Sequence, residues 1–314
     1  MTPERDPLYR DCHLCPRECG VDRIAGERGV CGETAVCRVA SIGPHFGEEP
    51  CFSGTRGSGT IFFSGCSCGC LFCQNHQISS GGVGEQWHFG ELVSHVRVLI
   101  DKGVHNLNFV TPSHFLPHIR ALRQFFREDG VDIPFLYNCS GYERVEKIRE
   151  IAPDIDVFLP DFKFSDPTLA RTCMGDEHYP EIALSAVEEM VSTKGFLQPW
   201  DPTGETPAES GVLVRHLVLP GHVDNTLVVL ERLRQRFGVN LPLSVMSQYR
   251  PTPHCRDAGS LARPLASSEY ERVCERIVEL GFEHVFIQPE SGDNAFSPDF
   301  SQDQPFPGNE QAEG

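Results

Sequence analysis

The run TIFFSGCSCGCLFCQN, residues 60–75, decides how the chain folds and where its chemistry lies. It opens with a short β-rich stretch, Thr60–Gly65, that ends in glycine, as strands usually do. Three cysteines follow at once with the spacing C-x3-C-x2-C, at Cys66, Cys70 and Cys73. The pattern predicts a strand that leads directly into a cysteine-bearing loop.

The rest of the chain alternates β-rich runs with helical patterns. Six further β-rich runs, bounded by Gly, Pro, Asn or Asp, are His105–Val110, Pro134–Ser140, Asp156–Lys163, Val212–Leu219, Leu241–Tyr249 and His284–Gln288. Between the runs, apolar residues recur at the three- and four-residue spacing of amphipathic helices in Phe89–Lys102, His118–Glu128, Glu143–Ile151, Glu181–Lys194, Asn225–Phe237 and Ser268–Leu280. The alternation predicts repeated βα units.

Repeated βα units indicate an α/β fold with a parallel sheet and helices outside it. Six or seven units are too few for a complete eight-stranded barrel, so we predict a partial (β/α)6 TIM-type barrel. A doubly wound open sheet is the alternative. In either fold the chemistry lies at the carboxyl ends of the strands.

The composition divides the chain into three parts. Residues 1–52 form a Cys- and Gly-rich segment with little periodicity, and residues 53–290 form the predicted barrel core. Residues 291–314 are polar and rich in Pro, Gly and acidic side chains. That composition predicts a disordered tail.

Charge and hydropathy exclude several classes of partner. The formal net charge of −17 argues against the basic surface of nucleic-acid-binding proteins. The polar start, Met1–Asp11, is not a secretory signal, and no apolar run approaches the roughly 18 residues that suggest a membrane span. We therefore expect a cytoplasmic protein with neither nucleic acid nor membrane as a partner.

The 14 cysteines need an explanation in a reducing compartment, where disulfides are rare and metal or catalytic roles are more common. Three thiolates in one loop bind separate irons of a cubane that normally takes four protein ligands, which leaves one iron with an open position. The alternative is a zinc site, which usually takes four ligands. Cys68 lies within the same loop and leaves other ligand triples open.

The cysteine spacing after the first strand resembles the signature of the radical S-adenosylmethionine (SAM) superfamily. In that superfamily SAM chelates the open iron, and the reduced cluster cleaves it to methionine and a 5′-deoxyadenosyl radical that abstracts hydrogen. The resemblance implies a radical SAM barrel and an oxidoreductase with a 4Fe–4S cluster on Cys66, Cys70 and Cys73. It also implies SAM as cofactor and a flavodoxin- or ferredoxin-like reductant.

Later strand ends resemble the pyruvate formate-lyase activating-enzyme-like branch, whose members activate glycyl-radical enzymes. The stretch LPDFKF resembles its D-x-K element, and VRHLVLPG matches its V-R-x-x-V-x-P-G element. The stretch NFVTPSHF departs from it, because TPS stands where many members have a GGE-type turn that contacts the cofactor. The match extends from about Cys12 to Gln288.

This resemblance implies cofactor contacts from residues that follow successive strands: Thr111, Asn138, Ser140, Asp161, Lys163 and Arg215. Arg215 is a candidate for the cofactor carboxylate, because the planar arginine fork binds carboxylates bidentately. A simple ion pair at the rim is the alternative for Asp161 and Lys163.

A second group of cysteines precedes the barrel, at Cys12, Cys15, Cys19 and Cys31. Four thiolates with a C-x2-C start and glycines for tight turns fit a closed metal site. Zinc and a second iron–sulfur cluster are both compatible, Cys37 or Cys51 can substitute as a ligand, and a loop without metal is the alternative.

Three functions follow from these observations. The first is hydrogen abstraction from a partner protein, such as a glycine of a glycyl-radical enzyme. The second keeps the radical chemistry but acts on a small molecule or a modified peptide. The third is a non-catalytic iron–sulfur or zinc protein for electron transfer or redox sensing, against which the open iron argues, because a pure electron carrier is better served by four cysteines.

Overall fold

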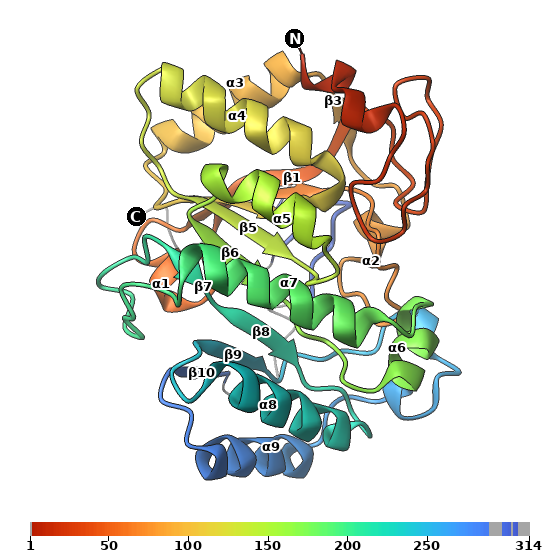
Figure 1. Cartoon of the computed structure of the whole chain (residues 1–314), viewed down its shortest axis with the longest axis vertical. Coiled ribbons are helices and arrows are strands. Elements are labelled where there is room, and N and C mark those ends of the chain that lie inside the picture. Colours follow the sequence, from red (N-terminus) through yellow and green to blue (C-terminus); the bar gives the residue numbers. More distant parts are fainter. Residues whose placement is uncertain (1, 289–296, 303, 307–314) are drawn as a thin grey trace.

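The computed structural model describes residues 2–288, 297–302 and 304–306 (Figure 1). The strands are β1 (Cys37–His45), β2 (Ser58–Phe63), β3 (Glu85–Trp87), β4 (Leu107–Val110), β5 (Phe135–Cys139), β6 (Val157–Pro160), β7 (Gly211–Val212), β8 (Val214–Leu217), β9 (Leu243–Met246) and β10 (Val285–Ile287). The α-helices are α1 (Pro50–Ser53), α2 (His76–Ser79), α3 (Phe89–Asp101), α4 (Leu116–Glu128), α5 (Val145–Ile151), α6 (Pro167–Met174), α7 (Tyr179–Lys194), α8 (Val223–Phe237) and α9 (Ser267–Leu280).

Two β-sheets lie edge to edge and form one curved sheet. The larger has the order β3-β1-β2-β4-β5-β6-β7, and the smaller has the order β10-β9-β8. All neighbours from β2 onward pair in parallel. A parallel bridge between Asp161 and Arg215 joins the end of β6 to β8, so that the second sheet continues the first.

The predicted partial barrel is confirmed. Each of the seven β-rich runs overlaps a strand, and each of the six helical patterns overlaps a helix whose bounds differ from the predicted ones by at most two residues. The βα units are β2–α3, β4–α4, β5–α5, β6–α7, β8–α8 and β9–α9, and β10 adds a further parallel strand. These six helices lie along the outer side of the curved sheet (Figure 1), which rules out the doubly wound alternative. Within the described chain, β3 and β10 are the two edges, so the barrel is open.

The cysteine-rich leader contributes a strand that the sequence did not predict. β1 pairs antiparallel with β2, from Val39 opposite Phe63 to His45 opposite Ser58. The short β3 pairs with the other side of β1. The predicted division at residue 52 therefore cuts off a strand that belongs to the main sheet.

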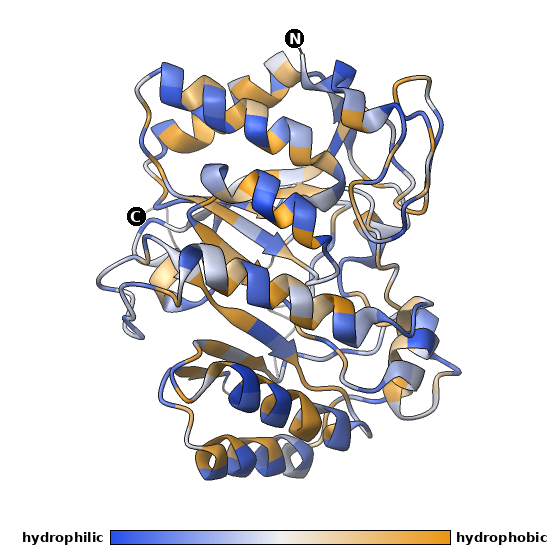
Figure 2. Ribbon diagram, in the orientation of Figure 1, coloured by the Kyte–Doolittle hydropathy of each residue, from blue (hydrophilic) through white to orange (hydrophobic). Residues whose placement is uncertain are grey.

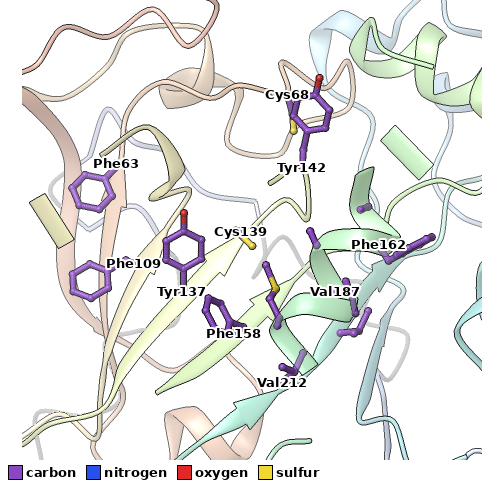
Figure 3. Packing of buried hydrophobic residues seen from close by; sticks show 14 of the residues in the cluster. Phe63, Cys68, Phe109, Tyr137, Cys139, Tyr142, Phe158, Phe162, Val187 and Val212 are labelled. Carbon is purple, nitrogen blue, oxygen red and sulfur yellow. The ribbon is translucent and has the colours of Figure 1, made fainter. Parts of the chain in front are cut away.

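The core lies between the sheet and its helices. Phe63, Phe109, Tyr137 and Phe158 come from successive parallel strands and lie side by side (Figure 3). The strands are mostly hydrophobic, whereas the helices carry both kinds of residue (Figure 2). Each such buried side chain stabilises the fold by about 1.5–3 kcal/mol. This packing holds the strands rigidly and so fixes where their carboxyl ends lie.

Part of the predicted disordered tail packs on the barrel. Residues 291–296, 303 and 307–314 lie outside the described residues. Phe300, however, is 4% exposed and its ring centroid lies 5.3 Å from that of Phe62. Gln77 of α2 fixes this segment, donating from Nε2 to Asp299 Oδ1 at 3.1 Å and accepting from the Phe300 amide at 2.7 Å. The described residues of the tail are thus ordered, in contrast to the disorder that their composition indicates.

No helix in the part of the chain that the structure describes combines the length and apolarity needed to cross a membrane.

Candidate functional site

The carboxyl ends of the parallel strands surround one cavity of about 480 Å³. It is lined by every residue that the sequence assigned to the cluster or the cofactor: Cys66, Cys70, Cys73, Thr111, Asn138, Ser140, Asp161, Lys163 and Arg215. The structure brings these side chains together from separate strands, although their individual roles stay predictions.

The cysteine loop between β2 and α2 is held by backbone hydrogen bonds from distant segments. The amide of Leu71 donates to the carbonyl of Cys173 at the end of α6 (2.8 Å), and the Leu71 carbonyl accepts from Thr252 Oγ1 (3.0 Å). The Gln74 side chain donates to the carbonyl of Gln248 after β9 (2.6 Å). The loop is therefore positioned by the barrel as a whole.

The three predicted ligands differ from Cys68 in their burial. Cys66, Cys70 and Cys73 are partly exposed, whereas Cys68 is 2% exposed. The Cys66 thiol donates a hydrogen bond to Cys68, and this bond together with burial raises the pKa of Cys66 well above its ordinary value; burial also raises the pKa of Cys73. Without metal the Cys66 and Cys73 thiols hold their protons at neutral pH, so that metal binding displaces these protons.

A single metal ion and a cluster place different demands on the thiols of this loop. In residues 2–288, 297–302 and 304–306, no group of three or more His, Cys, Asp or Glu side chains is arranged to hold one metal ion. A single ion needs its ligands around one point, whereas a cubane takes each thiolate on a different iron. All four cysteines of the loop line the cavity, and the three partly exposed ones, Cys66, Cys70 and Cys73, are the predicted cluster ligands.

Thr111 holds a strained conformation at the end of β4. Its φ of +56° lies in the left-handed region, which β-branched residues rarely adopt. Its amide donates to the carbonyl of Asn138 at 2.9 Å, which ties the turn after β4 to the end of β5. Glycine adopts this conformation freely, so the backbone of a glycine turn is kept although threonine stands there. Such strain costs about 1–3 kcal/mol and tends to cluster at functional sites.

Asp161 and Lys163 form an ion pair at the end of β6. Burial lowers the pKa of Lys163, but the Asp161 carboxylate outweighs it and leaves that pKa well above its ordinary value. Tyr179 fixes the surrounding backbone, because its hydroxyl accepts from the Lys163 amide at 2.9 Å and donates to the Ser140 carbonyl at 2.8 Å. At Gly141 a Cβ would lie 2.1 Å from the Asp161 carbonyl, so that only glycine lets these strand ends approach.

Arg215 is already bound to carboxylates of the chain itself. Its guanidinium contacts Glu48 and Glu49, which lie between β1 and α1 and also line the cavity. Glu48 is held further by Asn108 Nδ2 at 2.8 Å. Sequence reasoning missed both glutamates, because the GEEP stretch follows a strand that it did not predict and only the two adjacent acids mark it.

The four leader cysteines lie in the loops before β1. Cys12 and Cys15 are each 8% exposed, and burial raises the pKa of Cys15 to about 12. The buried guanidinium of Arg23 lies against Cys12, with Nη1 3.8 Å from Sγ. Within residues 2–288, 297–302 and 304–306, these cysteines do not form a group arranged to hold a single metal ion. The second metal site therefore stays a prediction.

The two candidate substitute ligands have structural surroundings of their own. Cys37 lies in β1, and its thiol donates to the Trp87 carbonyl at 3.3 Å. Cys51 lies in α1 and packs in a hydrophobic cluster with Leu136 and Val157. Both are fully buried, which favours a packing role for each.

Comparisons with known proteins give distant likenesses. No protein-family model matches the chain. The chain is 26% identical over 280 residues to a Methanocaldococcus jannaschii protein named "Uncharacterized protein MJ0674", with 85% of this chain and 74% of that protein covered. That name states no activity.

Solved structures resemble the chain at lower identity. Streptococcus suis SuiB bound to S-adenosylmethionine is 11% identical, with 68% of this chain and 44% of that chain covered and a TM-score of 0.45. HydG, a maturase of the [FeFe]-hydrogenase, is 14% identical, with 74% and 52% covered and a TM-score of 0.49. HydG from Carboxydothermus hydrogenoformans is 15% identical, with 70% and 55% covered and a TM-score of 0.41. The chain spans about half the length of these structures, and likenesses this weak carry no argument about its activity.

Proposed function

We propose that the chain is a radical SAM enzyme, an oxidoreductase whose 4Fe–4S cluster is held by Cys66, Cys70 and Cys73. One observation carries the proposal. The three partly exposed thiols follow the first barrel strand and face the same cavity as the residues at the ends of the next strands. A loop that offers three thiolates leaves one iron for a further ligand, as catalytic metal sites do.

The chemistry that the bound cofactors supply is reductive cleavage of SAM to methionine and a 5′-deoxyadenosyl radical that abstracts hydrogen. The chain's own part is to bind, orient and exclude water. The Asp161–Lys163 pair and the Ser140 backbone, both fixed by Tyr179, give the cavity a rigid polar side. Phe62 and Val110 give it an apolar side, which limits side reactions with water.

Arg215 is the residue proposed to bind the cofactor carboxylate. Its Nε and Nη2 already donate to Glu48 and Glu49, so a cofactor carboxylate can use these two donors only by displacing a glutamate. We propose that Arg215 first serves to neutralise these two glutamates, and that the cofactor carboxylate is its second partner. A flavodoxin- or ferredoxin-like protein is the proposed reductant.

Two substrate classes remain in the proposal. The first class is a glycine of a partner glycyl-radical enzyme. It is supported by the resemblance of the D-x-K and V-R-x-x-V-x-P-G elements to those of the activating-enzyme-like branch. A small molecule or modified peptide is favoured by one structural observation, since Pro298 and Phe306 of the C-terminal segment line the cavity and narrow it. A protein-based doublet in electron paramagnetic resonance (EPR), formed on incubation with a glycyl-radical partner, supports the first class. Cleavage of SAM without that doublet supports the second.

The experiment that tests the radical SAM assignment is EPR of the anaerobically reconstituted, reduced protein with and without SAM. A 4Fe–4S signal that changes when SAM is added supports the proposal. If the protein contains its full complement of iron and its EPR signal does not change when SAM is added, the proposal is contradicted and the electron-transfer alternative is favoured.

A further inference from the structure

The side chain of Arg17 joins the cysteine-rich leader to the cysteine loop. Arg17 lies between Cys15 and Cys19, and its Nε donates to the carbonyl oxygen of Ser67 at 2.9 Å. Its Nη2 donates to the carbonyl of Met174 at the end of α6 at 2.6 Å and lies 3.5 Å from the Cys68 carbonyl. A positive charge from the leader is thus seated directly on the backbone between the first two predicted cluster ligands.

The peptide that Arg17 contacts also contacts a cluster ligand. The Ser67 carbonyl and the Cys68 N–H belong to the same planar peptide group. That N–H donates to Sγ of Cys66 at 3.4 Å. Holding the carbonyl therefore holds the N–H on the sulfur, and hydrogen bonds in series polarise one another. The relay runs from the guanidinium through one peptide to the thiol of Cys66.

We infer that Arg17 is a positioning residue that raises the reduction potential of the cluster through the Ser67–Cys68 peptide. The inference rests on the proposed function. Reduction adds negative charge to a cluster, and hydrogen bonds to its sulfurs and nearby positive charge both stabilise the reduced form. Arg17 supplies the charge, and the peptide that it orients supplies the hydrogen bond.

Arg17 is held in place by contacts of its own. Its guanidinium lies 5.2 Å from the centre of the Tyr142 ring, a cation–π contact. The Tyr142 hydroxyl donates to Asp176, whose carboxylate is the nearby acidic group that offsets part of the positive charge. Met174, Tyr142 and Asp176 belong to the barrel. The guanidinium is therefore fixed from the barrel side as well as from the leader.

A neighbouring arginine provides a matched control. Arg144, which precedes α5, holds the same leader turn from its other side, with Nη1 2.5 Å from Glu18 Oε1 and 3.2 Å from the His13 carbonyl. These two contacts join Arg144 to leader residues and not to the cysteine loop. Loss of Arg144 therefore weakens docking of the turn without removing the relay to Cys66.

The experiment is a redox titration of the reconstituted full-length protein, followed by EPR of the reduced cluster and by iron content. For Arg17→Gln we expect an about tenfold lower ratio of reduced to oxidised cluster at a fixed potential, which is about 59 mV for a one-electron couple. Arg17→Lys keeps the charge and one donor but loses the fork, so we expect a smaller shift in the same direction. Arg144→Gln should keep the wild-type potential.

The outcomes separate this inference from the proposed function. If wild-type protein binds no 4Fe–4S cluster, the proposed function fails and this inference fails with it. If wild-type protein binds the cluster and responds to SAM but both Arg17 variants keep its potential, only the role of Arg17 is overturned. Equal shifts in Arg17→Gln and Arg144→Gln also overturn it, because they show that docking of the leader sets the potential. Loss of iron from Arg17→Gln leaves Arg17→Lys as the deciding variant.

Discussion

Arg215 on β8 and Glu49 before α1 form a two-point ion pair inside the barrel, with Arg215 Nε donating to Glu49 Oε1 at 3.0 Å and Nη2 contacting Oε2. Glu48 shares the same guanidinium. All three side chains are less than a tenth exposed. The loop that follows β1 is therefore fixed to the opposite side of the barrel by charge, and it closes one side of the cavity.

Removal of Arg215 should destabilise the protein strongly. Arg215→Ala leaves two buried carboxylates without a cation, and breaking a buried pair costs about 3–5 kcal/mol. Chemical denaturation measures the free energy of unfolding. Arg236→Ala is the control, because its pair with Glu188 is at the surface and should contribute nothing measurable. An Arg215→Ala protein as stable as the control variant would show that the glutamates find other partners.

The cysteine substitutions should separate cluster ligands from a buried neighbour. Cys70→Ala should abolish the 4Fe–4S signal, because only two of the three predicted cluster ligands remain. Cys68→Ala should keep the signal, since Cys68 is 2% exposed and lies between the ligands without being one. Iron analysis and EPR after reconstitution measure both. If Cys68→Ala is the variant that loses the cluster, the ligand assignment is wrong.

Glu143 should make stability depend on pH. It is buried, its Oε1 accepts from Ser113 Oγ at 2.5 Å, and burial raises its pKa from 4.5 to about 7. Below pH 4.5 both folded and unfolded chains hold the proton. Between pH 4.5 and 7 the unfolded chain releases it while the folded chain keeps it, so the free energy of unfolding falls as pH rises, by about 3 kcal/mol in total.

Denaturation of wild-type and Glu143→Gln proteins at pH 5 and pH 7.5 measures this dependence. Glutamine keeps an acceptor for Ser113 but has no proton to lose. The fall in stability from pH 5 to pH 7.5 should therefore be smaller in the variant. Identical falls in the two proteins would mean that Glu143 titrates at its ordinary pKa.

The C-terminal segment should depend on one aromatic anchor. Phe300→Ala removes the ring that packs against Phe62 and Phe306, and a buried Phe→Ala change costs about 3–5 kcal/mol of local packing. Hydrogen exchange of residues 297–302 should then become faster. Ser301→Ala is the control, because Ser301 is exposed and its hydroxyl bonds to Asp299 and Gln302 of the same segment. Unchanged exchange in Phe300→Ala would show that Gln77 alone holds the segment.

The barrel could be predicted from the sequence because its strands and helices carry local sequence patterns. β2 is buried at every residue and ends in the apolar run Ile61–Phe63, and α3 and α4 repeat apolar residues at helical spacing. β1 was not predictable, because CRVASIGPH contains glycine and proline and is mostly half-buried, so neither alternation nor a long apolar run marks it. The prediction of a disordered tail was wrong for its described residues for a similar reason. The tail is polar on average, and this average composition gives no weight to the two aromatic residues Phe300 and Phe306.

The candidate site was predictable one strand end at a time, but its internal contacts were not. The predicted site residues, which range in sequence from Cys66 to Arg215, line one cavity because parallel strands end on one side of the barrel. The topology alone dictates this arrangement. The partners of Arg215 lie 166 and 167 residues away along the chain, and no local pattern links them. The same holds for the contact between Arg17 and Ser67, 50 residues apart.

Formation of 5′-deoxyadenosine is the direct measure of whether this protein cleaves SAM. Anaerobically reconstituted wild-type protein, supplied with a reductant and SAM, should produce 5′-deoxyadenosine and methionine, while Cys70→Ala treated in the same way should produce neither. If wild-type protein holds an intact, fully reduced 4Fe–4S cluster and still yields no 5′-deoxyadenosine, the protein is not a radical SAM enzyme.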